Sequence, residues 1–225
     1  MAKLKCLEKY FEANTEATYK RNIDGKLCLV SADKEIRVNT AKAQYEKEAT
    51  PITTVISYVN EFLDMVSNNG SFNKPQLECI RIDGSDYPII DRAIIVKDCS
   101  WQAPIYDKKK KRYISWDSKY NIIQEQFDLK APQDIIWLKF TEDGYLGVVA
   151  DSFDINFRYD NSSGKLIRAI DKTKKWNTSF VVIFPLTKDL LASKFRKEIE
   201  TAVGNYLIEK GVPIIDYFSH NNFLY

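Results

Sequence analysis

The sequence has little of what most recognisable catalytic and cofactor motifs require. Its 225 residues include only 8 glycines, and none of them forms the glycine-rich loop that brings backbone amides close to a phosphate. Histidine occurs once, at His220, so mechanisms that need two imidazoles are excluded. We also find no nucleophile elbow and no activated cysteine motif. These absences favour a protein that works by binding over one that works by catalysis.

The four cysteines are too far apart in sequence to form a structural zinc site. They are Cys6, Cys28, Cys79 and Cys99, and no two of them make a Cys-x-x-Cys pair. Zinc ligands cluster so that short loops can close around the metal, and neither this spacing nor the histidine supply fits that need. We therefore expect free, mostly buried and reduced thiols, and we expect no cofactor.

Long apolar runs and a strong net charge are also missing. No stretch approaches the ~18 uninterrupted apolar residues of a membrane-spanning helix, so no membrane partner is expected. Residues 1–10 lack the apolar core of a signal peptide. The formal net charge of +2 is too small to indicate a nucleic-acid partner by itself. The sequence predicts a cytoplasmic protein, or one in a particle assembled in the cytoplasm.

The clearest structural signal lies near the C-terminus. Phe195, Ile199, Val203 and Leu207 recur at steps of four residues, which predicts an amphipathic helix. Gly211 is expected to end this helix in the left-handed conformation, because glycine adopts it without steric cost. Runs rich in Val and Ile precede and follow the helix, at residues 180–184 and 212–218. We therefore expect a strand–helix–strand unit, most simply with its two strands parallel.

The rest of the chain predicts further helices and a meander of strands. Thr50 and Pro51 resemble the cap and first residue of a second helix, whose apolar stripe runs through residues 52–66. A hairpin is expected around Asp24 and Gly25. Other strand candidates, separated by turn sequences, are residues 35–38, 77–82, 87–96, 135–140, 146–150, 155–159 and 166–170.

These patterns predict an α+β fold with a largely antiparallel sheet and a C-terminal strand–helix–strand unit. Residues 1–70 are expected to form a small N-terminal lobe of helices and a hairpin, or else to be part of the same domain. Residues 71–225 are expected to form a β-rich body that ends with the long helix.

A run of five basic residues is the candidate for contact with nucleic acid. Its members are Lys108, Lys109, Lys110, Lys111 and Arg112. Tyr106, Tyr113 and Trp116 flank the run, and positive charge beside aromatic rings suits a phosphate backbone with stacked bases. The alternative is the solvated tip of a hairpin, whose lysines discourage pairing with another strand edge.

An acidic-x-lysine triplet suggests a second kind of site. In magnesium-dependent nucleases of the restriction-endonuclease type, such a triplet lies on a strand and follows an upstream carboxylate. Here Asp117 and Asp91 (or Asp98) would hold Mg²⁺, and Lys119 would position or activate water. The spacing is common in a chain this charged, so it specifies little. A second, poorer set consists of Asp151, Asp154, Asp171 and Lys174.

The leading hypothesis from sequence is a non-catalytic structural or assembly protein that acts through protein–protein contacts. The 13 tyrosines suit this role, because tyrosine combines a large contact area with a polar end. A composition heavy in Lys, Asn, Ile and Tyr favours a bacteriophage virion or tail component. The alternatives are the magnesium-dependent nuclease and a nucleic-acid-binding accessory protein.

Overall fold

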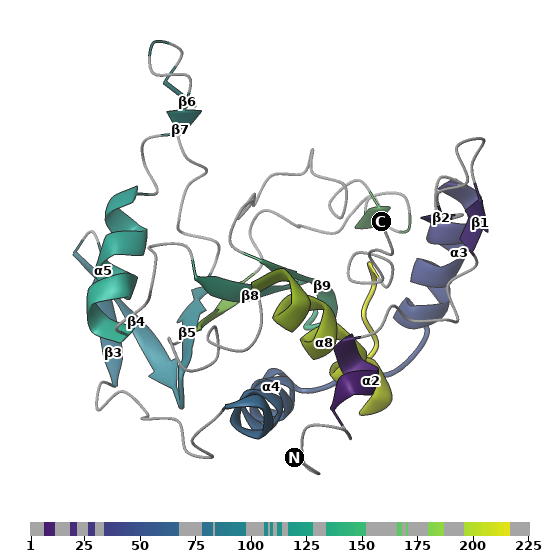
Figure 1. The fold of residues 1–225 in the computed structure, drawn as a ribbon, viewed down its shortest axis with the longest axis horizontal. Coiled ribbons are helices and arrows are strands. Elements are labelled where there is room, and N and C mark those ends of the chain that lie inside the picture. The colour runs from purple at the N-terminus through teal and green to yellow at the C-terminus, as the bar shows by residue number, and fades with distance from the viewer. Residues whose placement is uncertain are drawn as a thin grey trace.

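The chain folds as an α+β protein around one six-stranded antiparallel sheet, as the sequence predicts (Figure 1). The computed structural model describes residues 7–11, 19–21, 27–29, 34–67, 78–82, 84–97, 106–107, 109, 112–113, 117–127, 134–151, 166–167, 170, 180–186 and 196–216. Among them, no helix has both the length and the apolar character needed to cross a membrane.

The sheet has the strand order β3-β4-β5-β10-β8-β9, and all neighbouring strands are antiparallel. Its members are β3 (Cys79–Ile82), β4 (Ser85–Ile90), β5 (Ala93–Val96), β8 (Ile135–Phe140), β9 (Leu146–Asp151) and β10 (Val181–Pro185). Every residue of β8 and β10 is buried. Both faces of the sheet are therefore covered at its centre, which explains why the sequences of these two strands are apolar apart from Lys139.

The two faces of the sheet pack against different helices. These are mainly α4 (Ile52–Val66) and α8 (Arg196–Glu209) on one face, and α5 (Asp117–Phe127) on the other. Successive strand residues point to opposite faces. Ile136, Leu138 and Phe140 of β8 accordingly pack with α4 and α8, while Ile135 and Trp137 pack with α5. We call these the α8 face and the α5 face of the sheet.

The α4 helix is one of the elements that the sequence located well. Its apolar stripe is buried as expected and packs in the core of the α8 face. The start differs by one residue, because Pro51 rather than Thr50 is the cap and makes no side-chain capping bond. The carbonyl of Pro51 accepts the first bond of the helix, from the amide of Val55 at 3.0 Å.

The α8 helix ends at Gly211 as predicted, but residues 212–216, the described part of the strand expected after it, do not form a strand. Gly211 has φ 81°, and the amide of Val212 donates to the carbonyl of Leu207 at 2.9 Å, which closes the last turn. Of residues 212–216, only Ile214 makes a bridge, parallel to Leu146 of β9. Within the described residues, β10 has β5 and β8 as its neighbours and does not pair with residues 212–216, so the predicted parallel unit is wrong.

Three other strand predictions need correction. Residues 35–38 lie in α3 (Lys34–Tyr45), where Val38, Ala41 and Tyr45 follow helical spacing and pack in the core of the α5 face. The run at 87–96 is two strands, separated by a turn at which Asp91 has φ 56°. The described residues of 166–170 are helical and not extended. The strand predicted at 155–159 lies outside the described residues.

Two predicted hairpins are confirmed. One joins β1 (Tyr19–Arg21) to β2 (Leu27–Leu29), and the other joins β6 (Tyr106–Asp107) to β7 (Arg112–Tyr113). Cys79, by contrast, is exposed on β3 and not buried as expected.

The short helix α2 (Glu8–Phe11) packs across the C-terminal end of α8. The carboxylate of Glu209 accepts bonds from Lys9 at 2.6 Å and from the hydroxyl of Tyr10 at 2.8 Å. The side-chain amide of Asn205 donates to the carbonyl of Tyr10 at 2.8 Å. The ring of Tyr10 meets those of Phe62 and Tyr206 edge-on. Residues on both sides of the division predicted at 70–71 thus contribute to one core, and the division itself stays a prediction.

We expect Gly211→Ala to lower the free energy of unfolding by about 1 kcal/mol. No atom lies within 4 Å of the position that the new Cβ would take, so the cost comes from the left-handed backbone and not from a clash. Gly211→Asn should recover part of the loss, because asparagine tolerates this conformation better. Equal stability of all three forms in urea unfolding would contradict this account of the helix end.

Candidate functional site

The structure does not give the predicted nuclease residues the setting they require. Asp117 and Lys119 lie in the first turn of α5, whereas the nuclease arrangement needs this triplet on a strand. Asp91 is exposed in the turn between β4 and β5. No group of three or more His, Cys, Asp and Glu side chains within the described ranges is placed to hold a metal ion. The predicted magnesium site stays a prediction.

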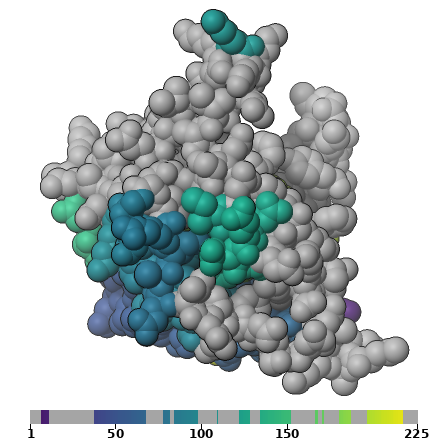
Figure 2. All heavy atoms as spheres, turned by 90° about the vertical axis from the view of Figure 1, so that its left-hand side faces the viewer, coloured from purple at the N-terminus to yellow at the C-terminus, as the bar shows by residue number. Residues whose placement is uncertain are grey.

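The two described residues of the predicted basic run, Lys109 and Arg112, belong to the β6–β7 hairpin. Tyr106 pairs with Tyr113 and Asp107 with Arg112, and Lys109 lies in a turn between the two strands. Lys109 is exposed in this turn, and Lys108, Lys110 and Lys111 lie outside the described residues. The hairpin stands away from the six-stranded sheet, at the top of both Figure 1 and Figure 2.

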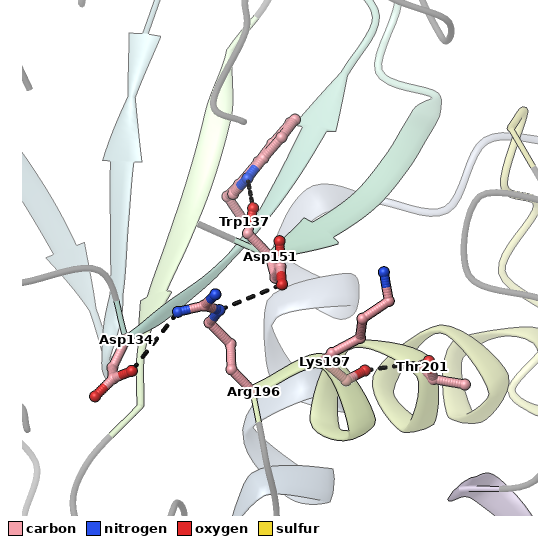
Figure 3. Close-up of polar contacts among 6 residues, drawn as sticks. All are labelled: Asp134, Trp137, Asp151, Arg196, Lys197 and Thr201. Atoms are coloured by element: carbon pink, nitrogen blue, oxygen red, sulfur yellow. Dashed lines mark hydrogen bonds and ion pairs between the residues drawn. The ribbon is translucent and has the colours of Figure 1, made fainter. Parts of the chain in front are cut away.

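A polar cluster lies where α8 begins, on the α8 face of the sheet (Figure 3). The guanidinium of Arg196 lies between two carboxylates: Nε is 3.3 Å from Oδ2 of Asp151, and Nη1 is 3.8 Å from Oδ1 of Asp134. Asp134 precedes β8 and Asp151 ends β9, and Ile136 pairs with Asp151, so the two strand ends are neighbours. The indole of Trp137 donates to the backbone carbonyl of Asp151 at 2.5 Å. We call Asp134, Asp151, Arg196 and Glu200 the Arg196 cluster.

Glu200 lies one helical turn after Arg196, and its side chain is buried. Burial raises the pKa of this carboxyl to about 8, and the negative charge of Asp151 adds to the effect. The positive charges of Lys197 and Arg196 oppose it but do not cancel it. Glu200 therefore carries its proton at neutral pH.

The Arg196 cluster is suited to fastening α8 onto the sheet. One cation contacts carboxylates from two adjacent strand ends, and the nearby acid is neutral, so one positive charge lies between two negative charges. The backbone carbonyl of Asp134 also accepts a bond from Leu186, next to β10, at 2.8 Å. The cluster thus ties together the ends of three strands and one helix. Partly buried charges that are paired in this way stabilise a particular arrangement of elements.

Sequence reasoning missed several buried charged residues, among them Glu200 and Lys139. The helical spacing assigns Glu200 to the solvent face of α8, whereas the structure buries it. Lys139 lies within the apolar run of β8 and has no exposed surface. A lysine inside a strand that is otherwise wholly apolar is a usable signal, because lysine is rarely buried without a partner. The sequence suggests Asp151 as a metal ligand, whereas the structure shows it paired with Arg196.

The α8 face of the sheet is covered over β5, β10, β8 and β9, but its β3–β4 part is exposed. The register places five residues on this part of the face, and all are exposed: Cys79, Arg81, Asp86, Pro88 and Ile90. We call them the β3–β4 patch. Figure 2 shows the blue and teal atoms of this region at the surface, next to the green atoms of α5. Arg81 and Asp86 form an exposed ion pair at 3.7 Å.

Comparisons of this chain with protein-family models, with curated proteins and with solved structures find no match.

We expect Arg196→Met to lower the free energy of unfolding by about 1–3 kcal/mol, because two partly buried carboxylates lose their charged partner. Lys197→Met is the matched control, since it removes a cation from the adjacent, exposed position and should change stability by less than about 0.5 kcal/mol. The two variants are compared by urea unfolding at pH 7. Equal losses would mean that Arg196 does not fasten α8.

Proposed function

We propose that this chain is a non-catalytic component of a larger assembly, and that it binds a protein partner through the β3–β4 patch. The supporting observation is an abrupt change in solvent exposure along one face of the sheet. Ala93 of β5 is completely buried beneath the helices. Ile90, which pairs with Ala93 from the neighbouring strand β4, is 40% exposed.

The composition of the β3–β4 patch suits a protein surface as its partner. Ile90, Pro88 and Cys79 supply apolar area, and Arg81 and Asp86 supply one charge of each sign. Protein interfaces combine an apolar centre with polar groups that fix orientation. A partner that extends over the patch would continue the cover that α4 and α8 give to the rest of the face.

The setting of the assembly is proposed from composition alone: a bacteriophage virion or tail. Sedimentation of a gentle lysate of the source tests it. The chain should travel with a particle far larger than its own mass of 26.1 kDa. Sedimentation near that mass would argue against any stable assembly under those conditions.

We expect Ile90→Asp to release the chain from that large fraction while leaving its thermal unfolding temperature nearly unchanged, because the side chain is already exposed. Met65→Asp is the matched control. Met65 is the other exposed large apolar residue among those described, at 37% exposure, but it lies on α4 and outside the patch. Retention of Ile90→Asp in the large fraction would place the contact elsewhere.

A second candidate function is nucleic-acid binding by the β6–β7 hairpin. It is favoured by the position of the hairpin, which stands clear of the sheet with Lys109 exposed in its turn (Figure 1). A basic tip at such a place can follow a phosphate backbone without moving the core. The magnesium-dependent nuclease has no comparable support, because Asp117 and Lys119 lie on a helix.

We expect replacement of Lys108, Lys109, Lys110 and Lys111 by glutamine to weaken binding of a single-stranded oligonucleotide and to flatten its salt dependence. For each phosphate that the variant no longer neutralises, the slope of log affinity against log salt should fall by about 0.7 for single strands. Substitution of Lys42 and Lys47, which are exposed on or just after α3, is the control for a general loss of charge. An unchanged slope in the hairpin variant would remove this candidate.

A further inference from the structure

We propose that Glu200, Asp151 and Arg196 form a proton-dependent latch that holds the first turns of α8 against the ends of β8 and β9. The latch is closed while Glu200 keeps its proton, and it is weakened when that proton is lost. The proposal concerns the α8 face, and it does not depend on the function proposed for the β3–β4 patch.

The geometry places the latch at the junction of helix and sheet. Arg196 and Glu200 are four residues apart on α8, so they lie on the same side of the helix. Arg196 reaches both Asp134 and Asp151, which belong to neighbouring strand ends (Figure 3). The side chain of Glu200 is only 7% exposed, so a charge that forms there is not solvated by bulk water.

The charges near Glu200 determine the response to pH. From α8 come Arg196 and Lys197, and from β9 comes Asp151, while Asp134 at the start of β8 shares Arg196. When Glu200 is protonated, Arg196 forms ion pairs with the two aspartates. When Glu200 ionises, its buried charge repels Asp151, and the attraction of Lys197 and Arg196 does not cancel the cost of burial. The closed arrangement is then less favourable.

The sign of the effect follows from the two protonation states. An unfolded Glu200 titrates near its ordinary pKa of 4.5, whereas the folded protein holds the proton up to about pH 8. Between these values unfolding releases one proton, so this residue makes the protein less stable as pH rises. Below the pKa of Glu200 in the unfolded state, the contribution of this residue to the free energy of unfolding is constant. Above about pH 8 that contribution has been lost completely.

Urea unfolding between pH 5.5 and 9 tests this for the wild type, Glu200→Gln and Glu198→Gln. Glu198 is the matched control, because it is an exposed glutamate on the same helix. Relative to Glu200→Gln, the unfolding constant of the wild type should rise by up to tenfold per pH unit, about 1.4 kcal/mol, and should level off near pH 8. Glu198→Gln should follow the wild type. Parallel curves for the wild type and Glu200→Gln would overturn the proposal.

Hydrogen exchange locates the change within the molecule. After correction for intrinsic rates, amides in the first turns of α8 should exchange faster at pH 9 than at pH 6.5 in the wild type, and equally at both values in Glu200→Gln. If Glu200→Gln fails to fold, Asp151→Asn provides the second test. It removes the repelling charge, so the pH midpoint of the exchange change should move lower. A midpoint unchanged in Asp151→Asn, or an increase retained in Glu200→Gln, would refute the latch.

Discussion

The structure depends on one constraint: the central strands of the sheet are buried on both faces. Because β8 and β10 have no exposed residues, each face of the sheet needs its own cover. The α4 and α8 helices, with α2 across them, supply cover on one side. The α5 helix and part of α3 supply it on the other. The Arg196 cluster supplies the polar contacts between the ends of the strands and α8, which belongs to the first of these two layers.

The cover does not extend over the whole sheet, and the uncovered part is where we place the partner. Ile80 and Tyr87 on the α5 face of β3 and β4 are buried, so this hairpin is a well-packed part of the sheet on one side. Its other side carries the β3–β4 patch. A rigid strand pair that is anchored on one face and open on the other can present fixed groups to a second surface without rearrangement.

The sequence reveals those elements whose periodicity is strong over ten or more residues. The helix at 52–66 is one example, because its buried face appears in the sequence as an apolar stripe. The end of α8 is another, because the left-handed turn there is occupied by a glycine, Gly211. The strand prediction at residues 35–38 is wrong because four alternating residues fit a strand, and only the longer pattern through Ala41 and Tyr45 shows the helix. The Arg196 cluster could not be found from sequence, since Asp134, Asp151 and Arg196 are brought together only by strand pairing and by the packing of α8 against the sheet.

The packing of α2 on α8 has a consequence for synthesis on the ribosome. Tyr10 and Glu209, which are bonded in the folded protein, are 199 residues apart. At typical translation rates the N-terminal partner waits roughly 10–40 s before the other is made. During that interval Phe62 and Tyr10 lack the ring of Tyr206, which completes their aromatic group. The nascent chain therefore displays an apolar surface for most of its elongation, and this surface is a natural substrate for chaperones that act on unfinished proteins.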